Sequence, residues 1–308
     1  MKGLEVLSTG YAKINHILDN QQLEKMVDTS DEWIVSRTGI KKRHISCKNS
    51  VDLAIEAAKE AIKNIDQSKI GLIVCATMTP ANRMPSNACL IQAGLNLNEQ
   101  DMMCFDISAA CSGFVYAMTI VNSLLKTMDD RYALIIGSEQ LSSIIDYQDR
   151  NTCILFGDGA GAMVVKNSQH AFYSYQNSAG NQEVLSAKND PQDYFLKMKG
   201  QEVFKFAIKV IPESIDQVLN QAGLTLDDID YVICHQANYR IIKHVYKKYR
   251  CPSDKFYMNL DEYGNTSAAS IPLALATMNE KGLIKKGMKL ILVGFGGGLT
   301  WGATLIEW

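Results

Sequence analysis

The chain has 308 residues, of which 47% are hydrophobic and 21% charged, enough apolar material for two units with cores of their own. Its formal net charge of -2 lacks the basic excess that would favour a nucleic-acid partner. The amino terminus has no apolar stretch of the signal-peptide kind, and nowhere do 18 apolar residues run together. We therefore expect a cytoplasmic protein with no membrane partner.

The eight cysteines form no C-x-x-C pair, and most stand inside apolar runs such as GLIVCATM. This pattern argues against a zinc site and against a disulfide scaffold, so we expect neither a metal nor a redox cofactor. Because a free cysteine is usually a small core residue, local context has to identify any nucleophile.

Two parts of the chain share one order of predicted elements. Apolar spacing predicts a helix over 51–65 and a buried strand over 70–78, and the same order recurs over 210–238. Cys75 then aligns with Cys234 without a gap, at an offset of 159 residues.

A second set of matches lies at nearly the same offset. Segment 103–128 predicts a strand, an elbow of small residues and an amphipathic helix, and a similar elbow opens a helix in 264–278. The strand predicted over 132–140 matches 289–297 at an offset of 157 residues. The near-constant offset indicates an internal duplication.

The duplication predicts an amino-terminal half at 1–167 and a carboxy-terminal half at 168–308. Buried strands that alternate with helices imply crossover connections, so each half is predicted to be an α/β unit with a mostly parallel sheet. The polar segment 167–200 is predicted to connect the halves and to include mobile surface loops.

Cys111 is the candidate nucleophile, because it lies at the strand-to-helix junction of 103–128. The unpaired N–H groups and the positive end of a helix favour a thiolate, so we expect a lowered pKa for Cys111. The small residues around it leave room for a substrate. On this segment alone, a buried structural cysteine at a helix start fits equally well.

Two polar residues are candidate companions of Cys111. His235 directly follows a predicted strand, and Asn265 lies in the second elbow. Each also fits a structural role, as a rim histidine and as a turn residue. The duplication favours function, because it places the Asn265 elbow near the position that Cys111 holds in the first half. The glycine run 296–298 forms a turn or lets backbone N–H groups approach a ligand, and it does not fit a dinucleotide or phosphate loop.

Five further motifs occur in one order: TSDEWIVSRTGIKKRHI (29–45), ILFGDGAGAMVV (154–165), CHQANYRII (234–242), GNTSAASIPLAL (264–275) and GFGGGLTWGA (294–303). With these motifs the chain resembles the β-ketoacyl-[acyl-carrier-protein] synthase III family over nearly its whole length. The resemblance implies a thiolase-like α/β fold, with two pseudo-duplicated halves in α-β-α-β-α layers. It implies a homodimeric acyltransferase that condenses an acyl-CoA primer with malonyl acyl carrier protein, with loss of carbon dioxide, and so initiates fatty acid biosynthesis.

The resemblance also implies residue roles. Cys111 is the nucleophile, and His235 and Asn265 hold the thioester carbonyl of the second substrate. The backbone N–H groups of Cys111 and Gly297 form the oxyanion hole. The residues expected to bind coenzyme A are Trp33, Arg37, Arg150 and Asn238. Those expected to dock the carrier protein are Arg240, Lys243, Lys247 and Lys248, and those expected at the acyl pocket are Phe295 and, from the partner subunit, Met84.

Other condensing enzymes fit the sequence less well. Degradative thiolases need a second cysteine near the final glycine run, and no cysteine follows Cys251. Hydroxymethylglutaryl-CoA synthases use a glutamate after the strand where this chain reads CATMTP (75–80). Extending synthases pair the cysteine with two histidines, whereas this chain has Asn265 in the second place.

An enzyme of a specialised polyketide-type pathway remains an open alternative. The sequence disfavours a non-catalytic acyl-binding homologue, which does not need Cys, His and Asn together. It also disfavours a cysteine hydrolase, because the small residues around Cys111 predict a narrow site that protects the thioester. Asn151 and Gln201 depart from the residues frequent in the family, which leaves coenzyme A contacts there less defined. Acetyl, branched and medium-chain primers all stay possible.

Overall fold

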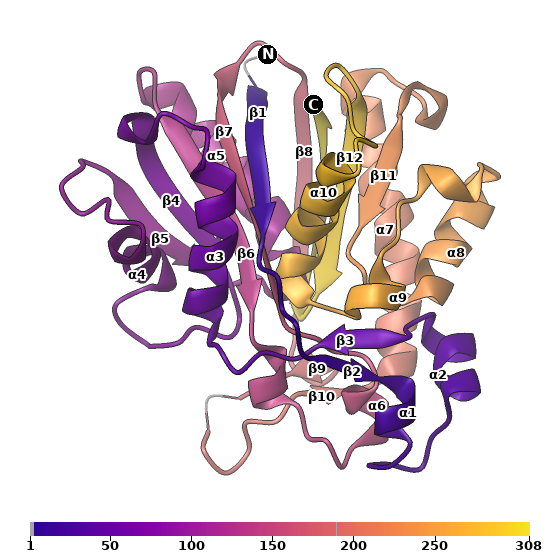
Figure 1. Ribbon diagram of the computed structural model, residues 1–308. Helices are drawn as coiled ribbons and strands as arrows, with labels where there is room; N and C mark the ends of the chain where they lie inside the picture. Colours follow the sequence, from indigo (N-terminus) through magenta and orange to yellow (C-terminus); the bar gives the residue numbers. More distant parts are fainter. Residues whose placement is uncertain (1–2, 189) are drawn as a thin grey trace.

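The computed structural model describes residues 3–188 and 190–308. Its strands form two main sheets (Figure 1), with the orders β1-β7-β6-β4-β5 and β8-β13-β12-β11. The strands of the first sheet are β1 (Gly3–Tyr11), β4 (Ile70–Ala76), β5 (Met103–Ile107), β6 (Tyr132–Glu139) and β7 (Gly159–Ser168). Those of the second are β8 (Phe172–Asn181), β11 (Tyr231–Cys234), β12 (Lys289–Gly296) and β13 (Gly298–Glu307).

The strand directions correct the prediction of mostly parallel sheets. β4 is parallel to β5 and β6, and β11 is parallel to β12, as crossover connections require. However, β7 runs antiparallel to β1 and β6, and β13 runs antiparallel to β8 and β12. Only Gly297 separates β12 from β13, and so short a connection joins only antiparallel strands. Each sheet is therefore mixed.

The two halves repeat at the offset seen in the sequence. The short 3-10 turns η2 (Ala110–Ser112) and η7 (Ser267–Ala269) are 157 residues apart, and so are β6 and β12. The helices that follow the turns, α5 (Gly113–Leu124) and α10 (Ser270–Glu280), start at the same offset. Each turn also begins with a non-glycine residue of left-handed φ: Ala110 at 43° in η2 and Ser267 at 48° in η7. These two residues are again 157 positions apart.

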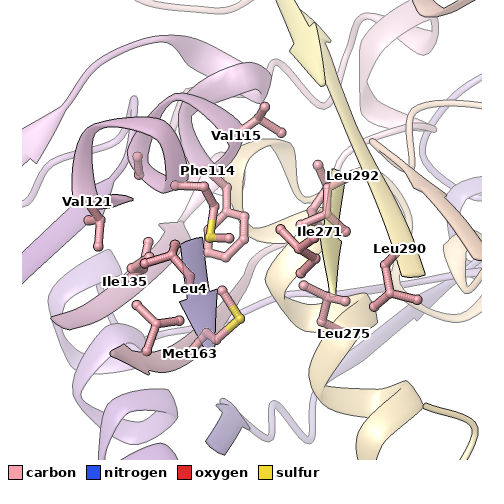
Figure 2. Close-up of a cluster of buried hydrophobic side chains, with 14 of the residues drawn as sticks. Leu4, Phe114, Val115, Val121, Ile135, Met163, Ile271, Leu275, Leu290 and Leu292 are labelled. Carbon is pink, nitrogen blue, oxygen red and sulfur yellow. The ribbon is translucent and has the colours of Figure 1, made fainter. Parts of the chain in front are cut away.

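The elements form five layers. In the central layer α5 and α10 pack between the sheets, and Figure 2 shows side chains from both helices and both sheets in one cluster. Side chains of β4 alternate between the layers: Leu72 and Val74 face the central cluster, whereas Ile73 and Cys75 face an outer cluster. That outer cluster contains residues of α3 (Ser50–Ile62) and α4 (Asn87–Gly94). The second sheet is covered on its outer face by α7 (Gly200–Ala222) and α8 (Tyr239–Tyr249).

Local sequence signals position these helices. The helix predicted over 51–65 is α3, which begins where the Asn49 side chain accepts hydrogen bonds from the backbone N–H groups of Val51 and Asp52. The predicted strand over 70–78 is β4, buried along its whole length. In the second half α7 begins ten residues before the predicted segment and ends at Gly223, whose left-handed φ of 66° closes the helix.

Segment 167–200 differs from its prediction as a connection between halves. Its largest part is β8, which pairs with β13 as an edge strand of the second sheet. The segment looks like a loop in sequence because half of β8 is exposed and polar, as an edge strand can be. The chain passes from the first sheet to the second between Ser168 and Phe172, and among the described residues no helix or strand lies between them.

The smaller elements lie together at the end of the molecule away from both termini (Figure 1). They are β2 (Ile17–Asp19), α1 (Asn20–Leu23), α2 (Asp31–Thr38), β3 (Lys42–His44), α6 (Arg150–Cys153), β9 (Leu185–Ser186), β10 (Lys197–Met198) and α9 (Leu260–Tyr263). Fully buried Arg43 joins them to the core, because its guanidinium donates to the Ile154 carbonyl and to Asn20 Oδ1. Among the described residues, no helix is long and apolar enough to cross a membrane.

Candidate active site

Cys111 lies in an elbow whose shape is fixed on several sides. The chain leaves β5 at Ile107, turns through η2 with the left-handed φ of Ala110, and enters α5 at Gly113. The neighbouring Ser112 hydroxyl contacts the Thr300 carbonyl oxygen at 3.0 Å and thereby ties the elbow to β13. The Cys111 side chain is 6% exposed, so the sulfur is recessed from the surface.

The expectation of a lowered pKa for Cys111 is wrong. Burial raises the pKa of the Cys111 thiol to about 12, although a hydrogen bond from Ser267 acts in the opposite direction. The dipole of a helix start favours a thiolate, but removal of the charge from water outweighs it here. The thiol therefore needs a proton acceptor before it can attack a substrate.

His235 follows β11, and its backbone N–H donates to the Val293 carbonyl oxygen at 2.7 Å, which fixes it to the end of β12. Its ring packs edge-on against Phe295, with centroids 5.1 Å apart. Burial lowers the pKa of His235 to about 3, so the imidazole is neutral at physiological pH. Its buried Nδ1 has no hydrogen-bond partner among residues 3–188 and 190–308. A neutral imidazole offers one N–H donor.

Asn265 is held in place by its own backbone and side chain. Its N–H donates to the Leu155 carbonyl oxygen at 2.9 Å, and its carbonyl oxygen accepts from the Gly157 N–H at 3.0 Å. The side-chain Oδ1 accepts from the Ser267 N–H at 2.9 Å. Because the oxygen is engaged, the amide NH₂ is the group left to donate to a ligand.

The glycine run lies against the nucleophile. A β-carbon on Gly296 would lie 2.8 Å from Cys111 Cβ and 3.1 Å from Sγ, so only glycine fits there without movement. A β-carbon on Gly297 would lie 3.5 Å from Ala110 Cβ, which places the Gly297 backbone beside the elbow. These contacts bring the predicted oxyanion-hole residues together.

Replacing Gly296 with alanine is expected to slow acylation of Cys111 on the order of tenfold to a hundredfold, because the sulfur must shift from its place. The rate of adduct formation with an acyl-CoA, followed by intact mass, measures this. Gly180→Ala is the matched control, since a β-carbon there meets no atom within 4 Å. Equal rates in the two variants would contradict the expectation.

Cys111, His235 and Asn265 line a single cavity of about 690 Å³. Of the other predicted site residues, Trp33, Arg37, Asn238, Arg240 and Phe295 line it as well. So do Asn151 and Gln201, the two positions at which the sequence departs from the family. The elbow of the first half and that of the second therefore meet in one space, as the duplication predicted.

Two cations lie near the ring of Trp33, which lines the cavity. Arg37 lines the cavity as well, whereas Arg150 is not among its lining residues. The guanidinium carbon of Arg150 lies 4.8 Å from the centre of the Trp33 ring, and that of Arg37 lies 6.0 Å from it. Arginine both stacks on aromatic rings and pairs with phosphate. Asn238 caps α8 by accepting the Arg240 N–H at 2.8 Å, so its side-chain oxygen is already occupied.

Other predicted residues lie outside this cavity. Met84 is 85% exposed and does not reach the cavity of its own chain. Lys247 and Lys248 are exposed on α8, and half-buried Lys243 lies with its ammonium 5.3 Å from the centre of the Tyr239 ring. In the described part of the chain, no cluster of three or more His, Cys, Asp or Glu residues could hold a metal ion.

Sequence reasoning missed two residues next to the nucleophile. A side-chain hydrogen bond with Ser267 lowers the pKa of Cys111. The negative charge of the buried Glu139 carboxylate raises the pKa of the same thiol. The 157-residue offset is the signal that could have pointed to Glu139. It aligns Glu139 in the sequence with Gly296, the glycine that packs against Cys111.

Comparison with known proteins gives consistent matches. A family model described as 3-Oxoacyl-[acyl-carrier-protein (ACP)] synthase III matches residues 105–180, and one for the C terminal of that synthase matches residues 219–308. The β-ketoacyl-[acyl-carrier-protein] synthase III of Clostridium botulinum (strain 657 / Type Ba4) is 48% identical over 326 residues, covering 100% of this chain and 99% of that protein. The protein of the same name from Clostridium acetobutylicum is 43% identical with the same coverage.

Solved structures resemble the chain over almost all of its length. The crystal structure of 3-oxoacyl-[acyl-carrier-protein] synthase III from Aquifex aeolicus VF5 has a TM-score of 0.94 and 43% identity, covering 99% of this chain and 100% of that one. The priming β-ketosynthase of the R1128 polyketide pathway has a TM-score of 0.90 and 30% identity, covering 99% and 96%.

Proposed function

The chain belongs to the 3-oxoacyl-[acyl-carrier-protein] synthase III family, and we propose that Cys111, His235 and Asn265 carry out its chemistry in the cavity that they line. The protein is an acyltransferase of the thiolase-like fold that performs the initiating condensation of fatty acid synthesis. The observation that carries the residue assignment is the convergence of these three groups in one cavity.

In the first proposed step, the Cys111 thiolate attacks the thioester carbonyl of an acyl-CoA. The N–H groups of Cys111 and Gly297 receive the negative oxygen of the tetrahedral intermediate, and the contact of the glycine run with Cys111 supports this pairing. Coenzyme A then leaves, and the acyl group stays on sulfur. Trp33, Arg37 and Arg150 suit the adenine and phosphates of coenzyme A because they combine an aromatic face with two cations.

In the second proposed step, malonyl acyl carrier protein enters and loses carbon dioxide. The enolate oxygen receives hydrogen bonds from neutral His235 and from the Asn265 amide, which stabilise the developing charge. The enolate carbon attacks the acyl thioester, a carbon–carbon bond forms, and the Cys111 thiolate is released. A β-ketoacyl carrier protein leaves. No metal or redox cofactor takes part in these steps.

We also propose that the exposed face of α8 docks the acyl carrier protein. Arg240 lies at the cavity, and Lys243, Lys247 and Lys248 continue along the same helix. Carrier proteins of this kind are acidic, so attraction at long range would raise the rate of encounter.

Neutralising this face should weaken use of the carrier protein. Lys247→Gln with Lys248→Gln is expected to raise the KM for malonyl carrier protein roughly two- to tenfold and to flatten its dependence on salt. The matched control is Lys285→Gln with Lys286→Gln, an exposed pair that precedes β12 at the end of the strand away from Gly296. A salt dependence unchanged from the wild-type protein would refute this docking surface.

A homodimer is proposed from family membership, with Met84 reaching the acyl pocket of the partner subunit. The strong exposure of Met84 supports this placement, because a flexible apolar side chain in water gains from a second surface. The cytoplasm is the proposed location, since coenzyme A thioesters and carrier proteins are used there. The specialised-pathway alternative is not favoured, because the fatty-acid synthases show the higher identities.

The condensation is tested by adding malonyl carrier protein to the protein together with acetyl-CoA. The expected product is a β-ketoacyl carrier protein with release of carbon dioxide, detected by mass spectrometry. Free acetate without that product would indicate a cysteine hydrolase, and unchanged acetyl-CoA would indicate a non-catalytic acyl-binding protein.

A further inference from the structure

Glu139 is a buried carboxylate next to the active site that the proposed steps leave unused. It ends β6 and is completely inaccessible to water. The carboxylate accepts hydrogen bonds from the backbone N–H of Thr79 at 3.1 Å, from the Thr79 hydroxyl at 2.6 Å, and from the Met78 N–H at 3.1 Å. All these partners are neutral. Burying a carboxylate among neutral groups is costly, so its presence calls for an explanation.

The internal duplication shows that the fold does not require this carboxylate. The equivalent of Glu139 in the second half is Gly296, which packs against Cys111 in η2. The equivalent of Ala110 in η2 is Ser267 in η7, with nearly the same left-handed φ. In the first half the strand end and the turn thus carry Glu139 and Ala110, whereas in the second half they carry Gly296 and Ser267. The same backbone is therefore built without the carboxylate in one half and without the hydroxyl in the other.

Ser267 connects the carboxylate to the nucleophile. Its hydroxyl contacts Met78 Sδ at 3.5 Å, and its side chain lowers the pKa of both Cys111 and Glu139. A thioether sulfur is a weak acceptor and does not hold a hydroxyl that can rotate. A hydroxyl has one hydrogen and two lone pairs, so it can accept from one neighbour while it donates to the other. A β-carbon on Gly137 of β6 would clash with the Ala268 carbonyl oxygen, and one on Gly113 would lie 3.6 Å from Ala268 Cβ. The turn η7, which carries Ser267, therefore packs against both the strand that ends at Glu139 and the elbow that holds Cys111.

We propose that Glu139 takes up the Cys111 proton through the Ser267 hydroxyl when the thiol attacks an acyl thioester. The inference rests on the proposed function and names the step by which its nucleophile is activated. The Sγ–H bond breaks as a new Oγ–H bond forms on Ser267, and the original Oγ–H bond breaks as an O–H bond forms on Glu139. After the thiolate has displaced coenzyme A, the proton returns through Ser267 to the departing thiolate, which leaves as the free thiol. Glu139 is thus a positioning residue that never touches the substrate.

The acidities of the groups favour Glu139 over His235 as the acceptor. Burial raises the pKa of Glu139 to about 7, against the hydrogen bonds that lower it, whereas burial lowers the pKa of His235 to about 3. A group with a pKa near the working pH can both take and return a proton. The other titratable groups that face Glu139 are Cys111 and buried Cys75, and Asp106 acts on Cys75 from β5.

The test separates the two half-reactions. Acylation of Cys111 by acetyl-CoA is followed in a single turnover by intact mass, and condensation is then started from preformed acetyl-enzyme with malonyl carrier protein. Glu139→Gln and Ser267→Ala are each expected to slow acylation by roughly 10² to 10⁴-fold at neutral pH, with condensation changed less than twofold. The double variant should be no slower than the slower single one, because the two residues act as one unit.

Two further readouts distinguish a relay from a structural role. Acylation by the wild-type protein should rise with pH through about 7, the pKa of Glu139, and this rise should vanish in Glu139→Gln but persist in Glu139→Asp. Ser267→Ala decides the matter if Glu139→Gln does not fold, since Ala110 shows that alanine adopts the required backbone.

Equal slowing of both half-reactions with a lower melting temperature, or acylation as fast as in the wild-type protein, would overturn the relay. The proposed function would stand in either case. Failure of the wild-type protein to be acylated at all would instead contradict the proposed function.

Discussion

Replacing His235 or Asn265 with alanine is expected to slow condensation by about 10² to 10³-fold, the usual effect of removing one hydrogen-bond donor from a developing oxyanion. The structure explains why neither donor is easily substituted. Asn265 is fixed by three hydrogen bonds, and His235 is fixed between the end of β12 and the ring of Phe295. Water admitted by either truncation would not be oriented in the same way.

The expected loss is specific to the second half-reaction. The rate of acetyl-enzyme formation should change much less than the rate of malonyl decarboxylation, which is measured as released carbon dioxide. His16→Ala is a matched control, because His16 is exposed and lies outside the cavity. If acylation fell as steeply as decarboxylation in both variants, the two residues would not be donors to the enolate.

Glu139→Gln is expected to stabilise the folded protein increasingly as the pH rises. The carboxyl has a pKa of about 7 in the fold against an ordinary value of 4.5, so the folded state binds its proton more tightly than the unfolded state. The stabilisation from that proton is complete below pH 4.5 and is lost as the pH rises through 7. Glutamine does not titrate. The free energy of unfolding of the variant should therefore gain about 3 kcal/mol on the wild-type protein between pH 4 and pH 8.

Urea unfolding of the two proteins at each pH measures this difference. Titrations common to both proteins cancel, and the remaining groups that face Glu139 are the thiols Cys111 and Cys75, whose raised pKa values lie above the range. A difference that is flat between pH 4 and pH 8 would show that the fold does not raise the pKa of Glu139. That result would also remove the acceptor from the proposed relay.

The sequence predicted the convergence of the site because the signals were local or repeated. The Cys111 elbow, the strand that precedes His235 and the turn at Asn265 are each visible in a short window. The 157-residue offset then related the two elbows, and the structure brings Cys111, His235 and Asn265 to one cavity. Their roles in the reaction remain predictions.

What the sequence could not supply is burial. The pKa of Cys111 is set by the layers that cover it and not by the helix start alone. The helix start therefore predicts a lowered pKa, whereas burial raises it. Glu139 was passed over because its partners Met78 and Thr79 lie about 60 residues away and meet it only in the folded sheet. β8 was taken for a loop because its exposed half carries polar residues.

The most direct test of the account is the site of acylation. After incubation with acetyl-CoA, intact mass should show one acetyl adduct, and peptide mapping should place it on Cys111. Cys111→Ala should take up none. An adduct that persists in Cys111→Ala, or that maps to another of the eight cysteines, would contradict the assignment of Cys111 as the nucleophile.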